Sequence, residues 1–147
     1  MIKQKHGFTI IEAVASIFIV TLVLTTAMAI VLNMRNQAMA SEQKIKATDA
    51  GSLIRNDISR NYIYRDINDW LDDQSKTLTY DDCTNATIDC SIFNDSNDER
   101  YFDNEITITF IRPTSEDISL KAIRYEITIT YFKERTLTMI GVIYEKA

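Results

Sequence analysis

Glu12 is the residue whose position most directly implies chemistry, because it is the only charged side chain between Gly7 and Leu32. A carboxylate in hydrocarbon is costly unless it is paired, and ionisable residues inside membrane segments are functional by default. A partner charge attracts strongly in a low-dielectric environment, although desolvation offsets much of that attraction. We therefore expect Glu12 to make a specific contact. The alternative is a carboxylate near the start of the segment that reaches the lipid headgroups.

The element that must position Glu12 is an apolar helix. No charged residue occurs from Ala13 to Leu32. At about 1.5 Å per residue this stretch makes a helix of about 30 Å, the thickness of the hydrocarbon core of a bilayer. Lys3 and Lys5 precede it, and basic residues beside a first spanning helix stay on the cytoplasmic side. We therefore expect a single membrane span with the C-terminal part of the chain outside.

A candidate cleavage junction with a small residue, Gly7, lies before this segment. A secretory signal peptide has its cleavage site after the apolar region, whereas Gly7-Phe8 precedes it, so the anchor would survive cleavage. The sequence from Gly7 to Glu12, GFTIIE, resembles the type IV prepilin signature, which is a glycine, an aromatic residue and then a glutamate at the fifth mature position. The match covers roughly residues 1–35. Beyond them only the general layout is similar to pilins and pseudopilins.

The resemblance implies that prepilin peptidase cuts after Gly7 and that the new amine of Phe8 is methylated, so both residues are substrate positions. It also implies that Glu12 meets the N-terminal amine of a neighbouring subunit. Residues 1–7 would be a leader peptide, residues 8–34 a transmembrane and filament-core helix, and residues 35–147 an extracytoplasmic head that includes the amphipathic half of the helix. Ala29 replaces the proline of many major pilins, which favours a minor pilin or a pseudopilin.

The composition predicts one acidic domain outside the membrane. The chain has 16 Lys and Arg against 21 Asp and Glu, a net charge of −5. Loss of Lys3 and Lys5 lowers the basic count from 16 to 14 and the net charge from −5 to −7. Ten aspartates and two glutamates lie between Asp66 and Glu105, against Lys76 and Arg100 only. This balance disfavours a nucleic-acid partner.

The helix is expected to continue beyond the membrane, because apolar residues recur at helical spacing and no proline interrupts them. They are Ala40, Ala47, Ala50, Ile54, Ile58 and Tyr62. We expect one helix from Phe8 to about Tyr62, ~80 Å long at 1.5 Å per residue. From Asn68 to Asn104 polar residues predominate, which predicts a connecting region outside the core. Local anchors of this region would be Trp70 with Leu71 and Ile92 with Phe93.

The C-terminal part predicts an antiparallel sheet with one apolar face. Alternation typical of strands covers residues 105–111, 122–132 and 136–144, with a hairpin at 133–135 and a longer connection at 112–120. One face of the middle strand is apolar, and its members are Ile123, Tyr125, Ile127, Ile129 and Tyr131. The predicted fold is α+β, a long N-terminal helix packed under a C-terminal antiparallel sheet. Gly141 suggests a bulge or a close approach of the helix.

The only two cysteines, Cys83 and Cys90, lie in the connecting region. An extracytoplasmic location favours a disulfide between them. Two free thiols in a reducing environment are the alternative. A zinc site is disfavoured, because His6 is the only histidine and would leave with the leader.

A calcium loop is also disfavoured. Asp95, Asn97 and Glu99 alternate oxygen ligands, but no glycine follows at the turn. The position of the closing glutamate falls at Ile106. We therefore expect neither a metal nor another cofactor.

The residues predict a structural protein and no enzyme, because the mature chain would have no histidine, phosphate loop or activated nucleophile. The resemblance implies a minor pilin or pseudopilin of a type IV pilus, or of a type II secretion or competence filament. Its partners would be other subunits, prepilin peptidase, the inner-membrane assembly platform and the membrane. It would sit in the cytoplasmic membrane and then in an extracellular or periplasmic filament.

Two alternatives remain. The first is a filament-borne adhesin or DNA-uptake subunit, but acidic residues interrupt its candidate basic stripe. The basic candidates are Arg112, Lys121, Arg124, Lys133 and Arg135. The second is an anchored sensor, which shares the topology but has no use for the Gly7-Phe8 junction or for Glu12.

Overall fold

The computed structural model describes residues 9–81, 83, 88–94 and 105–145. The chain divides into two compact units, Met1–Met39 and Ala40–Ala147, and we call the second unit the head. One helix, α1 (Ile10–Asn61), belongs to both units. We call residues 10–39 the exposed half of α1 and residues 40–61 its covered half. The expected helix from residue 8 to about 62 is confirmed over the described residues.

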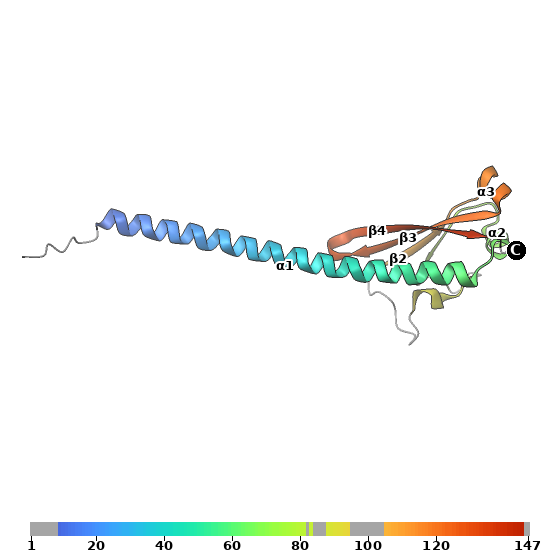
Figure 1. Cartoon of the computed structure of the whole chain (residues 1–147), viewed down its shortest axis with the longest axis horizontal. Coiled ribbons are helices and arrows are strands. Elements are labelled where there is room, and N and C mark those ends of the chain that lie inside the picture. Colours follow the sequence, from blue (N-terminus) through green and yellow to red (C-terminus); the bar gives the residue numbers. More distant parts are fainter. Residues whose placement is uncertain (1–8, 82, 84–87, 95–104, 146–147) are drawn as a thin grey trace, which may run out of the picture. The chain divides into compact units, whose positions relative to one another are not determined.

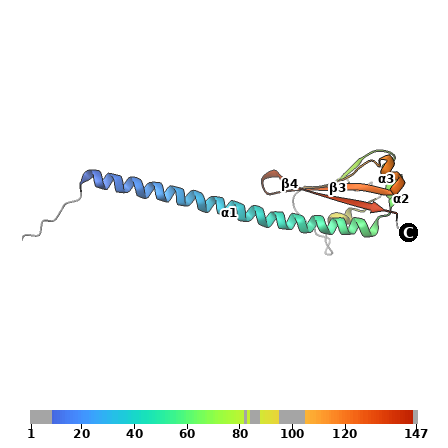
Figure 2. The same cartoon turned by 45° about the horizontal axis from the view of Figure 1, so that its top comes forward.

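The head contains a four-stranded antiparallel sheet in the order β1-β2-β3-β4. Its strands are β1 (Lys76–Thr79), β2 (Ile106–Phe110), β3 (Ala122–Tyr131) and β4 (Arg135–Tyr144). β3 and β4 lie along the covered half of α1 in both views (Figures 1 and 2). The three expected strands are confirmed, and the fold is α+β.

The core lies between the covered half of α1 and the sheet. The helix buries five members of its expected stripe, Ala40, Ala47, Ala50, Ile54 and Ile58, and also Gly51, whereas Tyr62 is partly buried. The five expected apolar residues of β3 are buried as well. A Cβ added at Gly51 would lie 2.6 Å from Met139 Sδ and 3.2 Å from Ile129 Cδ1. The small residue therefore lets the sheet approach the helix closely.

The region from residue 68 to 104 is more than the connection that its composition predicts. It contains the end of α2 (Tyr64–Leu71), strand β1 and the 3-10 turn η2 (Cys90–Phe93). Several of its apolar side chains belong to the core, and these are Leu71, Leu78, Ile88, Ile92 and Phe93. The prediction of a region outside the core was wrong there, because single apolar residues in short elements show no periodicity.

Trp70 packs within the head, as expected. Its ring meets Phe110 edge-on, with 5.6 Å between the ring centroids. The ammonium group of Lys76, the first residue of β1, lies 5.0 Å from the centroid of the Trp70 ring.

The connection between β2 and β3 contains a short helix, α3 (Ser115–Leu120). Thr114 and Asp117 cap it reciprocally, since each side chain accepts a backbone N–H of the other residue. A further 3-10 turn, η3 (Phe132–Glu134), joins β3 to β4. Lys133 and Glu134 have φ of 52° and 62°, a conformation that usually favours glycine or asparagine.

Gly141 makes neither a bulge nor a direct approach of the helix, so both expectations for it were wrong. The pairing of β3 with β4 is uninterrupted, and Gly141 lies opposite Tyr125. A Cβ at position 141 would overlap the Tyr125 ring. That ring crosses the glycine, and its hydroxyl donates to the Arg55 carbonyl of α1 at 3.2 Å. Burial raises the pKa of Tyr125 to about 12.

Candidate functional site

The exposed half of α1 presents apolar side chains on all sides. None of the described side chains from residue 9 to 39 is buried. Ile10 is 86% exposed, and Phe18 and Met34 are 68% and 64% exposed. In the described part of the chain, α1 is long and apolar enough to cross a membrane. The segment therefore has the composition and length that the sequence predicts for an anchor.

The hydroxyl groups of this segment find their acceptors inside the helix. Ser16 donates to the Glu12 carbonyl at 2.8 Å, and Thr21 donates to the Ile17 carbonyl at 2.8 Å. Thr25 and Thr26 both donate to the Leu22 carbonyl at 3.0 Å. Helical serines and threonines can satisfy themselves in this way. These hydroxyls therefore need no partner from the surroundings, which suits a segment in hydrocarbon.

Glu12 lies in the first turn of α1 and is exposed. Its backbone N–H donates to the Thr9 carbonyl at 3.1 Å and approaches the Thr9 hydroxyl at 3.4 Å. That hydroxyl donates in turn to Glu12 Oε2 at 3.5 Å, the one partner of this carboxylate among the described residues. A helix N-terminus favours a carboxylate at this position. The Thr9-x-x-Glu12 spacing is a helix-start signature that the sequence analysis missed.

Gly7 and Phe8 lie outside the described residues. Cleavage after Gly7, methylation of Phe8 and pairing of its amine with Glu12 therefore remain predictions. The first described residue, Thr9, follows this junction directly.

The structure confirms the predicted disulfide between Cys83 and Cys90, whose Cα atoms are 5.5 Å apart. The alternative of two free thiols is wrong. Cys83 is buried and belongs to the core of the head, and Cys90 begins η2. Asp89 caps η2, because its carboxylate accepts from the Ser91 N–H at 3.0 Å. The bridge therefore fixes the buried Ile92 and Phe93 relative to the end of β1.

The end of α1 holds the same loop through Tyr62. The Asp89 N–H donates to the Tyr62 hydroxyl at 3.0 Å. Burial raises the pKa of Tyr62, and the hydrogen bond from the Asp89 backbone acts in the opposite direction. Asp57 lies about one turn before Tyr62. Burial and then the Asp89 carboxylate raise the pKa of Asp57, whereas the charge of Arg60 lowers it.

The ligands of the disfavoured calcium loop, Asp95, Asn97 and Glu99, fall outside the described residues. Within the described ranges, no group of three or more His, Cys, Asp or Glu side chains is placed to hold a metal ion.

Two of the five basic candidates for a DNA stripe are engaged in ion pairs. Arg124 Nη2 lies 2.8 Å from Asp117 Oδ2, and Lys121 contacts Glu145. Hydrogen bonds from Thr114 and then the Arg124 guanidinium lower the pKa of Asp117 to about 2. The interleaved acidic residues therefore neutralise part of the stripe, as their positions in the sequence suggest.

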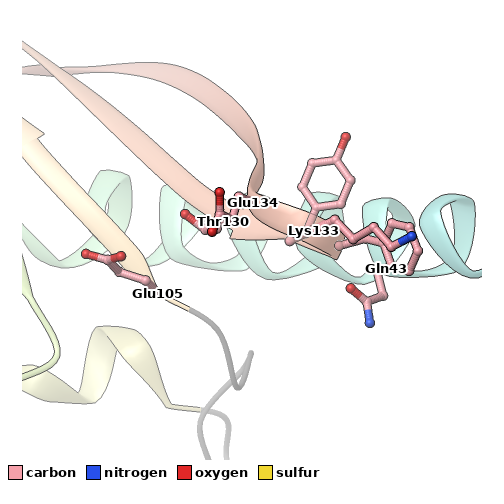
Figure 3. Close-up of a pocket in the computed structure, with 7 residues that line it drawn as sticks. Gln43, Glu105, Thr130, Lys133 and Glu134 are labelled. Atoms are coloured by element: carbon pink, nitrogen blue, oxygen red, sulfur yellow. The ribbon is translucent and has the colours of Figure 1, made fainter.

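A cavity of about 380 Å³ lies at the β3–β4 hairpin. Its lining residues are Gln43, Glu105, Thr130, Tyr131, Phe132, Lys133 and Glu134. The labelled side chains come from the hairpin, from α1 (Gln43) and from the residue before β2 (Glu105), and they do not converge on one point (Figure 3). No histidine, cysteine or serine is among the lining residues. The cavity is therefore not the candidate site, which remains the exposed half of α1 with Glu12.

No family model matches the chain, and no curated protein or solved structure matches it either. What the structure provides is a long N-terminal apolar helix whose covered half packs against an antiparallel sheet, together with a disulfide. This arrangement is compatible with a pilin-like fold.

Proposed function

We propose that the chain is a membrane-anchored structural subunit, a minor pilin or pseudopilin, of a filament of the type IV pilus class. The observation that supports this most is the contrast within the exposed half of α1. Its hydroxyls are satisfied by the helix backbone, and between Ile10 and Leu32 Glu12 is the only charged side chain. Such a segment suits a lipid bilayer and a bundle of identical helices equally well.

In this proposal the subunit waits in the cytoplasmic membrane with its head outside. Prepilin peptidase removes residues 1–7 on the cytoplasmic side, and an assembly platform then moves the subunit into the filament. Contacts between helices replace lipid contacts around residues 10–34. Glu12 pairs with the Phe8 amine of a neighbouring subunit, which sets the axial position of one helix against the next. The Ala29 position and the absence of a proline in the anchor favour a minor subunit of a pilus, secretion or competence filament.

The charge at Glu12 is the decisive test. We expect Glu12→Gln to leave the amount of protein in the membrane unchanged and to reduce its amount in sheared filaments at least about tenfold, since breaking a buried pair is strongly destabilising. The matched control is Glu42→Gln, because Glu42 is a surface residue of the same helix that pairs with Lys46 at 3.0 Å. Exposed pairs of this kind contribute little.

Quantitative mass spectrometry of membranes and sheared filaments from the native host would measure both amounts. Wild-type levels of Glu12→Gln in filaments would reject the pairing role. Loss of the variant from the membrane would show that Glu12 directs insertion instead.

The same spectra test the processing step. We expect a mature protein that begins with methylated Phe8. Gly7→Val should leave Met1 in place, because a bulky side chain blocks close approach of the peptidase to the backbone. Detection of the intact wild-type chain in cells with active peptidase would contradict the assignment of this junction.

A further inference from the structure

Strand β4 is a long, unprotected edge of the sheet. It lies outermost in the strand order and has ten residues, Arg135–Tyr144, without a proline. Its pairing with β3 has no bulge, and Arg135 is its only charged residue. Soluble proteins usually protect such an edge with charges, prolines, bulges or a covering segment. In the described part of the chain, β3 is the only strand that pairs with β4.

The backbone groups that face the open edge can be assigned from the hydrogen bonds of the strand. The Glu145 N–H donates to the Lys121 carbonyl at 3.1 Å, so Glu145 points its backbone groups towards β3. Backbone groups alternate in direction along an antiparallel strand. The odd-numbered residues of β4 therefore bond to β3, and Thr136, Thr138, Ile140, Val142 and Tyr144 direct their N–H and C=O groups to the open edge.

The edge presents large apolar side chains on both faces. Ile140 is 67% exposed and Tyr144 is 60% exposed on the face away from α1. On the face towards α1, Leu137 and Met139 are only partly buried against the core. Between α1 and β4 a cavity of about 340 Å³ is lined in part by Asn56, Ser59 and Tyr144. The edge is therefore open to an incoming strand.

We propose that β4 pairs antiparallel with β4 of a second copy of this chain, about a twofold axis at Ile140. This register uses every edge-facing backbone group from Thr136 to Tyr144. It places Met139 opposite the partner's Gly141, over which the Tyr125 ring of that copy lies. It places Arg135 opposite the partner's Glu145, which forms an ion pair with Lys121 of its own chain. Opposite charges across strands stabilise such pairing.

Neighbouring registers lose these matches. A twofold axis at Met139 sets Arg135 opposite the partner's Ile143. An axis at Gly141 sets Leu137 opposite the partner's Glu145. The sequence of β4 is therefore self-complementary in charge about Ile140.

The twofold axis determines the orientation of the two copies. The covered half of α1 runs along β4 in each copy (Figures 1 and 2), so the two helices are antiparallel in the joined sheet. The pairing does not depend on the proposed function. Under that function it would connect subunits that point in opposite directions, as in two neighbouring filaments, and not subunits of one filament.

Cysteine cross-linking of the full chain in detergent tests the register. In an antiparallel hydrogen-bonded pair the two Cα atoms lie about 5.5 Å apart, a distance that a disulfide spans. We expect Ile140→Cys to form a covalent dimer on mild oxidation. Thr136→Cys is the matched control on the same edge, and it should cross-link only when mixed with Tyr144→Cys. Equal cross-linking of Thr136→Cys alone, or none of Ile140→Cys, would overturn the register.

Sedimentation of the same full-length protein tests the pairing itself. Ile140→Lys sets two like charges opposite each other at the axis, and we expect it to raise the dimer dissociation constant more than about tenfold. Ile118→Lys is the control, because Ile118 is a 53% exposed apolar residue that belongs to α3 and not to β4. A monomeric wild type, or an equal effect of both substitutions, would overturn the proposal.

Discussion

The two halves of α1 share one backbone conformation but differ in what surrounds their apolar side chains. Ile19 in the exposed half is 61% exposed, whereas Ile54 in the covered half is 0% exposed beneath the sheet. The exposed half has no charged residue from Ala13 to Leu32 and presents apolar side chains on every side there. The covered half has one buried apolar stripe, and most of its other residues are polar, such as Lys46 and Glu42, which pair at 3.0 Å. The surroundings of each half are thus encoded in how its apolar residues are distributed.

The two halves of α1 also differ in the size of the side chains that they present to their neighbours. In the covered half, small residues such as Ala47, Ala50 and Gly51 let the sheet come close, so the contact is specific in shape. In the exposed half, large side chains such as Phe18 and Leu24 project outward and suit any apolar environment. The covered half fits one particular surface, that of the sheet, whereas the exposed half suits any apolar environment.

The largest expected effect comes from truncating an isoleucine in the covered half, compared with the same change in the exposed half. Ile54→Ala should lower the free energy of unfolding of the head by about 2 to 5 kcal/mol, because it leaves a cavity in the core. Ile19→Ala is the matched control and should change it by less than about 0.5 kcal/mol. Urea titration of the detergent-solubilised chain, followed by Trp70 fluorescence, measures both. Equal losses would end the distinction between the halves.

The disulfide is the next largest contribution, because it secures the loop that packs at the end of the covered half. Cys83→Ser with Cys90→Ser should lower the free energy of unfolding by about 2 to 3 kcal/mol, since the short loop gains freedom in the unfolded chain. Reduction of the wild type should reproduce the loss. A reduced protein as stable as the oxidised one would show that core packing of Ile92 and Phe93 holds the loop by itself.

Gly141→Ala probes how closely the sheet fits the covered half. The added Cβ would overlap the Tyr125 ring, and we expect a loss of about 1 to 3 kcal/mol from the displaced ring. In a Tyr125→Leu background the same substitution should cost almost nothing, because the ring is absent. A thermal-denaturation double-mutant cycle measures this coupling. Additive losses would place the strain elsewhere.

The smallest expected effect concerns charge on the head, away from α1. Hydrogen bonds from Thr114 lower the pKa of Asp117 from its ordinary value of 3.8 to about 2, so this carboxylate stabilises α3 at pH values above 3.8. Its contribution should disappear as the pH falls through about 2, when protonation weakens the bonds to Thr114 and Arg124. An NMR titration of the carboxyl carbon, with Glu116 as a neighbouring control, would show it. A midpoint near 3.8 would contradict the capping geometry.

Long periodic elements could be predicted from the sequence. The stripe from Ala40 to Ile58 and the alternation from Ile123 to Tyr131 repeat often enough to determine both the type of element and its buried face. The disulfide between Cys83 and Cys90 could be predicted because the expected anchor implies an oxidising compartment for them. In each case many residues, or a single strong constraint, point to the same conclusion.

Short elements could not be predicted in the same way. In β1 only Leu78 is buried, so four residues show no alternation. α3 was hidden by Pro113, although Thr114 and Asp117 have the spacing of a capping pair. At Gly141 the sequence shows that space is needed but not which group fills it, because Tyr125 lies sixteen residues away and reaches it only through strand pairing.

The intrahelical hydrogen bonds of Ser16, Thr21, Thr25 and Thr26 have a kinetic consequence. A polar group that is hydrogen-bonded to water or to a neighbouring chain must break that hydrogen bond before its helix can move. These four hydroxyls are bonded only within their own helix, so the segment can exchange one apolar neighbour for another without a hydrogen-bond barrier. In a bilayer or a helix bundle, rotation and sliding of the segment would then be resisted only by packing and by the contact that Glu12 makes.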